Sequence, residues 1–299
     1  MHAKKHKIST TNLTIQKGRS MTSPRQFAQV DVFASQPYAG NPVAVILDAD
    51  GLTAEEMQRI ARWTNLSETT FVQAPTDRAA DYRVRIFTQT KEIPFAGHPT
   101  LGTARAWLNA GRVPATTGTI VQECAAGLIE LRHCEEQLSF AAPPTIRTGS
   151  LEQDYLDRIA SALGIPSAQI LDHQWVDNGP GWAAVRLADA EAVLALEPDF
   201  SDLPEAMVGV VGAHPHGAPH DFELRAFAPA ANVVEDPVTG SLNASVAQWL
   251  IGTGRAPRRY TAAQGTRLGR AGEIVVTSEG DRVWIGGNTT VLFNGTAIA

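Results

Sequence analysis

A strand–loop–helix pattern occurs twice in this sequence, and it constrains the fold more than any other feature. Residues 85–108 read RIFTQTKEIPFAGHPTLGTARAWL, and residues 225–250 read RAFAPAANVVEDPVTGSLNASVAQWL. Each segment begins Arg-x-Phe, crosses a loop with a Gly-containing turn, and continues into an apolar helix that ends Trp-Leu. Backbone N–H groups at a helix start form a ready anion-binding site. The repeat therefore predicts two halves that face one another across one small anionic ligand.

The composition is typical of a globular protein with a substantial core. The chain has 299 residues, of which 43% are hydrophobic and 19% are charged, and this length favours two domains. The net charge is -6 and no basic stripe follows the N-terminus, so we expect no nucleic-acid partner. No apolar run reaches the roughly 18 residues of a membrane span, so we expect no membrane partner. The two cysteines, Cys124 and Cys134, are interpreted as reduced thiols, which favours a cytoplasmic location.

Residues 1–22 differ from the rest of the chain, because they are basic and polar and lack the apolar region of a secretory signal. We expect a disordered leader there, with Met21 as a plausible start and a targeting presequence as the alternative. Residues 23–143 are predicted to form an N-terminal lobe and residues 144–287 a C-terminal lobe. A C-terminal strand at about 288–299 can return to the N-terminal lobe. Strands alternate with single helices, so we predict an α+β fold in which each sheet wraps around a helix.

The first Gly-containing turn carries a histidine at the predicted helix start. Pro99 suits the first helical position, because its missing N–H would have no partner there. Gly97 allows the backbone to approach a ligand closely, and His98 lies at the positive end of the helix dipole. The alternative is that His98 is only a polar cap. Its place in a duplicated turn favours a functional role.

The second turn, EDPVTGS at residues 235–241, carries a carboxylate just before its helix. Thr239 or Ser241 can cap this helix, and Gly240 again exposes backbone N–H groups. The simpler interpretation of Asp236 is that it complements the helix dipole. Two adjacent carboxylates followed by a capping triplet favour a functional role instead.

A third candidate is Glu68, which lies between a predicted helix end and a β-branched strand. Thr53 and Glu56 form a capping-box pattern at the start of that helix, and Asn65 lies near its end. Strands disfavour glutamate, so local propensity explains Glu68 poorly. It is either a solvated loop carboxylate or a general base whose pKa is adjusted by partial burial and by neighbours such as His98. No metal-ligand spacing, phosphate loop or dinucleotide motif is present, so we expect no metal.

Five segments, in this order, resemble the phenazine biosynthesis PhzF family from about residue 27 almost to the C-terminus. They are DVFASQPYAGNPVAVILDADGL, MQRIARWTNLSETTFV, RIFTQTKEIPFAGHPTLGTARAWL, DNGPGWAAVRL and VVEDPVTGS. The resemblance implies a cofactor-free isomerase of the diaminopimelate-epimerase fold, in which two pseudo-symmetric lobes, each a mostly antiparallel curled sheet around a central helix, enclose a cleft. It also implies a homodimer that acts on a small carboxylate.

The resemblance also implies roles for individual residues. The acid/base glutamate of the family falls on Glu68, its histidine on His98 and its acidic partner on Asp236. We group these three as catalytic. The residues that we assign to substrate binding lie in the two turns and in two further matching segments, and they are Gly97, Thr239, Gly240, Ser241, Asn41 and Gln264.

The sequence also bears on the reaction. The related epimerases use one cysteine in each turn, whereas both turns lack cysteine here, which disfavours a two-thiol racemisation. A single carboxylate that takes a proton and returns it to another carbon fits better. The best-known reaction of the family isomerises trans-2,3-dihydro-3-hydroxyanthranilate, and residues 178–180 match the enzymes that perform it, whereas Asp177 and Gly181-Trp182 depart from them. A racemase, epimerase or lyase in the same cleft and an idle ligand-binding protein are the alternatives.

Overall fold

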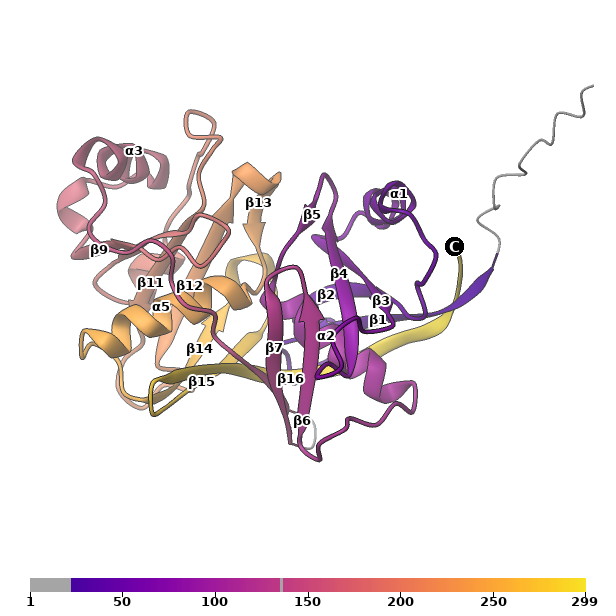
Figure 1. Ribbon diagram of the computed structural model, residues 1–299. Coiled ribbons are helices and arrows are strands. Elements are labelled where there is room, and N and C mark those ends of the chain that lie inside the picture. The colour runs from indigo at the N-terminus through magenta and orange to yellow at the C-terminus, as the bar shows by residue number, and fades with distance from the viewer. Residues whose placement is uncertain (1–22, 135–136) are drawn as a thin grey trace, which may run out of the picture.

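The computed structural model describes residues 23–134 and 137–299, so the leader predicted at residues 1–22 lies outside the described residues. The fold is mixed α and β, with many strands and few helices (Figure 1). The first half of the chain contains β1 (Pro24–Val32), β2 (Asn41–Ile46), α1 (Ala54–Thr64), β3 (Glu68–Gln73), β4 (Tyr82–Thr88), β5 (Glu92–Ile93), α2 (Gly97–Asn109), β6 (Thr119–Cys124), β7 (Gly127–Cys134) and β8 (Gln137–Ala141). The second half contains α3 (Gln153–Leu163), η1 (Ser167–Gln169), β9 (Asp172–Trp175), β10 (Ala183–Arg186), α4 (Ala190–Leu194), β11 (Val208–Ala213), β12 (Phe222–Ala228), η2 (Pro229–Ala231), β13 (Val233–Asp236), α5 (Gly240–Gly252), β14 (Arg259–Gln264), η3 (Thr266–Leu268), β15 (Gly272–Glu279) and β16 (Arg282–Ile298).

The strands of the first half close into a ring around α2. Their order is β1-β2-β3-β4-β6-β7-β8-β16, and β16 pairs with β1 to complete the circuit. The ring continues from β16 into the strands of the second half, in the order β15-β14-β12-β11-β10-β9. The long strand β16 therefore belongs to both halves, because its first residues pair with β15 and β8 and its later residues pair with β1.

The helices α2 and α5 are buried on nearly all sides because their sequences are rich in small and apolar residues. Gly102 shows why small residues are needed, since a Cβ there would lie 2.3 Å from Cγ1 of Val43. In Figure 1, α2 lies among the strands of the first half and α5 against the strands of the second. Leu101 of α2 and Leu242 of α5 belong to the same hydrophobic cluster, so one core extends across both halves.

Two predicted helix starts can be compared directly with the structure. The capping box of Thr53 and Glu56 is confirmed, and Asn65 ends that helix in a left-handed conformation. By contrast, α2 begins at Gly97, so Pro99 is the third helical residue and the prediction that it is the first was wrong. The third N–H of a helix also lacks an intrahelical acceptor, so proline is tolerated there for the same reason. Among the described residues, no helix is long and apolar enough to span a membrane.

Candidate active site

The starts of α2 and α5 meet backbone to backbone. A Cβ on Gly97 would lie 2.8 Å from the Cα of Gly240, and a Cβ on Gly240 would lie 2.9 Å from the Cα of Gly97. The first N–H groups of each helix have no acceptor within their own helix, and each helix start carries a partial positive charge. Two such ends brought together form a place where an anion can be held. This contact brings together the two Gly-containing turns of the sequence repeat.

Glu68 and His98 lie beside this contact, at the first residue of β3 and the second residue of α2. Oε2 of Glu68 is 3.3 Å from Nε2 of His98, but the two atoms are not aligned as a hydrogen bond. Both atoms are buried and have no hydrogen-bond partner among the described residues. The Glu68 side chain is 15% exposed, whereas that of His98 is 4% exposed. Buried polar atoms without a partner are rare, and here they mark a place where a ligand can supply one.

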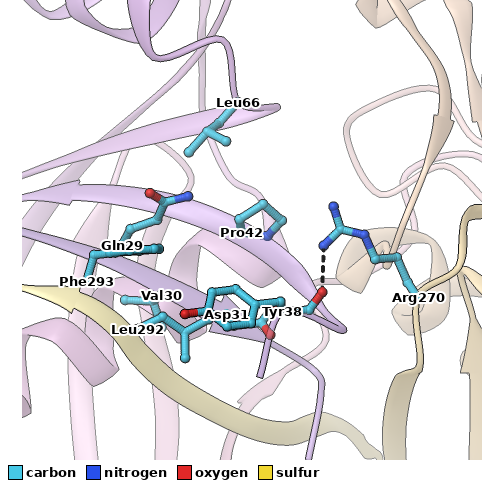
Figure 2. A pocket seen from close by; sticks show the side chains of 9 residues that line it. All are labelled: Gln29, Val30, Asp31, Tyr38, Pro42, Leu66, Arg270, Leu292 and Phe293. Carbon is cyan, nitrogen blue, oxygen red and sulfur yellow. Dashed lines mark hydrogen bonds between the residues drawn. The ribbon is translucent and has the colours of Figure 1, made fainter. Parts of the chain in front are cut away.

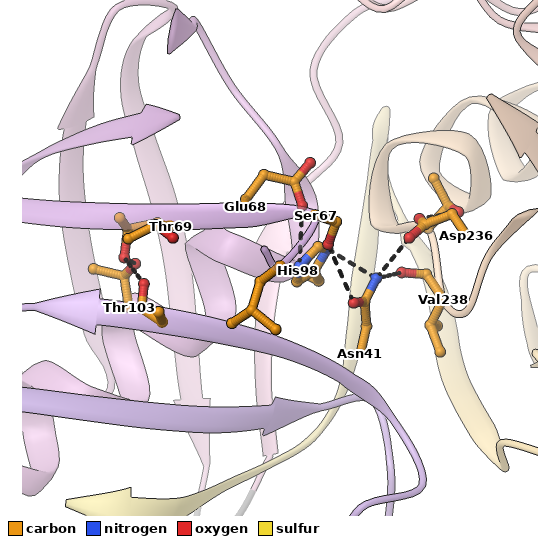
Figure 3. Close-up of polar contacts among 12 residues, drawn as sticks. Asn41, Ser67, Glu68, Thr69, His98, Thr103, Asp236 and Val238 are labelled. Carbon is orange, nitrogen blue, oxygen red and sulfur yellow. Dashed lines mark hydrogen bonds and ion pairs between the residues drawn. The ribbon is translucent and has the colours of Figure 1, made fainter. Parts of the chain in front are cut away.

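Asn41, the first residue of β2, joins the two halves (Figure 3). Its Nδ2 donates to Oδ1 of Asp236 and to the carbonyl oxygen of Val238, both at 2.9 Å, and lies 3.3 Å from Nδ1 of His98. An amide NH₂ group donates hydrogen bonds and cannot accept them, so Nδ1 of His98 faces it as an unprotonated nitrogen. The hydrogen-bond pattern therefore assigns the ring proton to Nε2, the atom that faces Glu68.

A second set of hydrogen bonds holds Asp236 and the turn before α5. Oδ2 of Asp236 accepts a hydrogen bond from Oγ1 of Thr239 at 2.5 Å. Oε1 of Gln264 accepts from the backbone N–H of Thr239 and from Nδ2 of Asn243, and Nε2 of Gln264 donates to Asp236 O and Thr239 Oγ1. The amide of Gln264 thus uses both donors and two acceptor positions within the protein. It braces the turn.

Burial governs the charges of the three titratable groups. Burial and the nearby Asp236 carboxylate raise the pKa of Glu68 to about 8. Burial also raises the pKa of Asp236 to about 6, opposed by hydrogen bonds from Thr239 and Asn41. Burial lowers the pKa of His98 to about 3. At neutral pH the site therefore holds a neutral histidine, a largely protonated Glu68 and a largely ionised Asp236.

Most of the predicted residues lie in one cluster. Six of them are joined by the contacts above, and Gly97 and Gly240 form the adjoining backbone contact; the six are Asn41, Glu68, His98, Asp236, Thr239 and Gln264. Ser241 lies at the start of α5, where its Oγ accepts a hydrogen bond from Nε1 of Trp182 at 3.0 Å. Its carbonyl oxygen accepts one from Nδ2 of Asn178 at 2.9 Å.

Sequence reasoning missed three members of the cluster. Ser67 donates to Oδ1 of Asn41 at 3.5 Å, Val238 contributes its carbonyl oxygen, and Asn243 donates to the carbonyl oxygen of Thr239 and to Gln264. The position of Ser67 next to Glu68 was a usable signal. Nothing in the local sequence around Asn243 pointed to the site.

A cavity of about 350 Å³ is lined by residues outside the cluster (Figure 2). Its wall includes Pro42 and Leu66, which neighbour Asn41 and Glu68 in sequence, but none of the residues predicted for the site. Arg270 of the second half also lines it. The Nη1 atom of Arg270 donates to the carbonyl oxygens of Tyr38 and Gly40, each at 3.1 Å, so the second half holds the loop that presents Asn41. We assign the chemistry to the polar cluster, because it contains the titratable groups.

Comparison with known proteins identifies the family of this chain. The family described as phenazine biosynthesis-like protein, PhzC-PhzF, matches residues 30–298. The Schizosaccharomyces pombe protein named antisense-enhancing sequence 1 is 38% identical over 289 residues, which cover 90% of this chain and 97% of that protein. The trans-2,3-dihydro-3-hydroxyanthranilate isomerase of Pseudomonas chlororaphis is 36% identical over 282 residues, 90% of this chain and 98% of that enzyme.

Solved structures show the same fold. A phenazine biosynthesis PhzF family protein of Enterococcus faecalis matches with a TM-score of 0.77 and 29% identity, covering 92% of this chain and 99% of its own. A hydroxyproline epimerase of Agrobacterium vitis matches with a TM-score of 0.58 and 12% identity, covering 93% of this chain and 92% of its own. The second likeness is one of fold alone, and it places the chain among epimerase-like folds.

Proposed function

The chain belongs to the phenazine biosynthesis-like family and is an isomerase, and we propose that it moves a proton between two carbons of a small carboxylate with Glu68 as the shuttle. The observation that carries this proposal is the pair of buried, unpartnered atoms, Oε2 of Glu68 and Nε2 of His98, beside the meeting helix starts. Such a pair provides a proton carrier and a donor within reach of one anion site.

The substrate carboxylate is proposed to bind where α2 and α5 meet. The N–H groups of Gly97, His98, Gly240 and Ser241 belong to the first turns of the two helices, where no intrahelical acceptor is in reach, so they supply donors there, and no side-chain charge is needed to attract the anion. With the carboxylate fixed, negative charge that develops on the adjoining π-system lies close to the same positive helix ends. Donors fixed in advance are usually the largest electrostatic contribution to such a reaction.

Glu68 acts in its ionised form on the first carbon and in its protonated form on the second. Its raised pKa suits both steps, because a carboxyl group of ordinary pKa would be a weak base near neutral pH. Nε2–H of His98 faces the glutamate and can donate to it or to the substrate. Asp236 holds Asn41, and its charge keeps the pKa of Glu68 high. We thus assign Asp236 and Gln264 to positioning and Glu68 to proton transfer.

For the substrate, we propose trans-2,3-dihydro-3-hydroxyanthranilate as the first compound to test. The Pseudomonas chlororaphis relative carries that name at 36% identity. The name of the more similar fission yeast relative gives no substrate. Asp177, Gly181 and Trp182 depart from the matching loop, and Trp182 contacts Ser241, so this loop is where a different substrate would be selected.

An epimerase is the second candidate, because the site holds two coupled carboxyl groups. Asp236 could then return a proton to the opposite face of the carbon that Glu68 deprotonates. Turnover in deuterated water followed by NMR separates the two reactions. Isomerisation gives a shifted double bond with the label at a new carbon. Label at the original carbon with inverted configuration supports the epimerase, and tight binding without turnover across a carboxylate series supports an idle binding protein.

We further propose that the two halves are pseudo-symmetric lobes, since each presents an Arg-x-Phe strand, a glycine turn and a buried helix in the same order. We also propose a homodimer that uses no cofactor, as the family resemblance implies, and a cytoplasmic location, which the two free cysteines favour. Light scattering on the purified chain tests the dimer, because a dimer has twice the 32.0 kDa mass of one chain.

A further inference from the structure

The repeat carries a second duplicated feature, an arginine–glutamate pair with two parallel hydrogen bonds. In the first half, Nε and Nη2 of Arg85 donate to the two carboxylate oxygens of Glu92, each at 2.7 Å. In the second half, Nε and Nη2 of Arg225 donate to the two oxygens of Glu235, each at 2.9 Å. In both halves the arginine lies on the longer strand and the glutamate on the short strand paired with it. Two-pronged pairs of this kind fix orientation as well as distance.

The two copies differ in burial and in further contacts. The side chains of Arg85 and Glu92 are 20% and 37% exposed, whereas those of Arg225 and Glu235 are 5% and 9% exposed. The Nη1 atom of Arg225 also donates to the carbonyl oxygens of Val193 at 3.3 Å and Leu196 at 2.7 Å, near the end of α4. The buried guanidinium therefore links β12, β13 and the region after α4, and its charge is fully paired.

The buried copy is joined directly to the site, because Glu235 precedes Asp236 in the chain. β13 has four residues and pairs with β12 at two positions, Asp236 opposite Ala226 and Val233 opposite Ala228, with a shift in register between them. Backbone pairing thus fixes the main chain of Asp236 at the end of a short, irregular strand, and the buried ion pair of the preceding residue adds a side-chain anchor to that strand. In the first half the residue after Glu92 is Ile93, so the exposed pair precedes no carboxylate.

We propose that Arg225 and Glu235 are positioning residues for the isomerase reaction, holding the Asp236 carboxylate where Asn41 and Thr239 meet it. This inference rests on the proposed function. A shift of Asp236 would remove an acceptor from Nδ2 of Asn41, which in turn faces Nδ1 of His98. The helix-start N–H groups that bind the substrate would stay in place. Loss of the pair is therefore expected to lower kcat and to leave KM nearly unchanged.

The test compares the same substitution in the two copies. Glu235→Gln is expected to lower kcat at least about tenfold, because misplacement of a site group by about 1 Å can reduce rates a hundredfold. Its KM should change less than about threefold. The matched control is Glu92→Gln, for which kcat and KM should stay within about twofold of the unsubstituted protein. All are assayed well below their melting temperatures, with trans-2,3-dihydro-3-hydroxyanthranilate or the carboxylate found to turn over.

A second variant separates positioning from folding. Removing one partner of a buried ion pair destabilises strongly, whereas replacing both partners by apolar residues is often neutral. The double substitution Arg225→Met with Glu235→Met should therefore remain folded and show the same fall in kcat. Equal kcat in this variant and in the Glu92→Gln control would overturn the inference. A raised KM with an unchanged kcat would overturn it too. Glu68→Gln in the same assay separates failure of the proposed function from failure of this inference. If Glu68→Gln retains turnover, the proposed function fails. If Glu68→Gln loses turnover but the Arg225 and Glu235 variants retain it, this inference alone fails.

Discussion

The Cα atom of Gly240 lies 2.8 Å from the point where a Cβ on Gly97 would stand. Real Cβ atoms do not approach another carbon so closely, so any larger residue at either position must push the two helix starts apart. The two glycines are 143 residues apart in the chain and begin the two buried helices. Their contact sets how near the two groups of positive N–H donors come to one anion.

We expect Gly240→Ala to raise KM for the carboxylate substrate at least about tenfold and to destabilise the fold by about 1–3 kcal/mol, the range for overpacked sites. Gly252→Ala is the matched control, because it lies at the other end of α5 and a Cβ there meets nothing within 4 Å. Alanine is favoured over glycine in helices, so Gly252→Ala should be neutral or slightly stabilising. Steady-state kinetics and thermal unfolding measure both effects. An unchanged KM in Gly240→Ala would argue against an anion site at this contact.

The raised pKa of Glu68 predicts that stability falls as the pH rises from 6.5 to 8. The folded protein keeps a proton on Glu68 up to a pKa of about 8, whereas the unfolded chain loses this proton near pH 4.5. The stabilisation is therefore complete below pH 4.5 and is lost as the pH rises to about 8. His98 changes the unfolding free energy between pH 6.5 and about 3, and Asp236 changes it between pH 3.8 and about 6. Neither group therefore dominates the range from pH 6.5 to 8. The unfolding free energy should fall by at most about 1.4 kcal/mol per pH unit. Glu68→Gln should flatten the profile in urea titrations, and an equally steep profile in that variant would assign the slope to other groups.

The same group predicts a pH dependence of the reaction. If ionised Glu68 takes the first proton, kcat/KM should rise with pH and level off above the Glu68 pKa of about 8. The Asp236 charge contributes to that raised pKa, so Asp236→Asn should move the midpoint to lower pH while reducing kcat. Kinetics across pH 5.5–9.5 in constant ionic strength measure the midpoint. A midpoint that stays near 8 in Asp236→Asn would show that Asp236 does not act on Glu68.

Local patterns drew attention to the two turns and to Glu68, because helix starts and an unexpected carboxylate leave a signature in a few consecutive residues. The role of Glu68 came from the family resemblance. The contacts of Asn41 could not be found in this way. Its partners His98 and Asp236 are 57 and 195 residues away, and only the closed ring of strands brings them together. The cluster is thus a product of topology.

Two further differences have physical causes. Thr239 was predicted as a possible cap of α5, and it does occupy the N-cap position, but its hydroxyl makes no capping bond, because it donates to Asp236 and accepts from Nε2 of Gln264. The duplicated ion pairs escaped prediction because the spacing differs between copies. Glu92 follows Arg85 by 7 residues, whereas Glu235 follows Arg225 by 10, so aligning the two repeats does not match the glutamates.

The most direct measurement is the turnover of Glu68→Gln. At neutral pH Glu68 is largely protonated, and glutamine has nearly the same shape, so the variant should fold normally and keep the substrate KM within a few fold. With Glu92→Gln as the control for loss of a glutamate outside the cluster, we predict that kcat falls about a hundredfold to ten-thousandfold in Glu68→Gln and stays unchanged in the control. A folded Glu68→Gln protein with near-full turnover would contradict Glu68 as the proton shuttle.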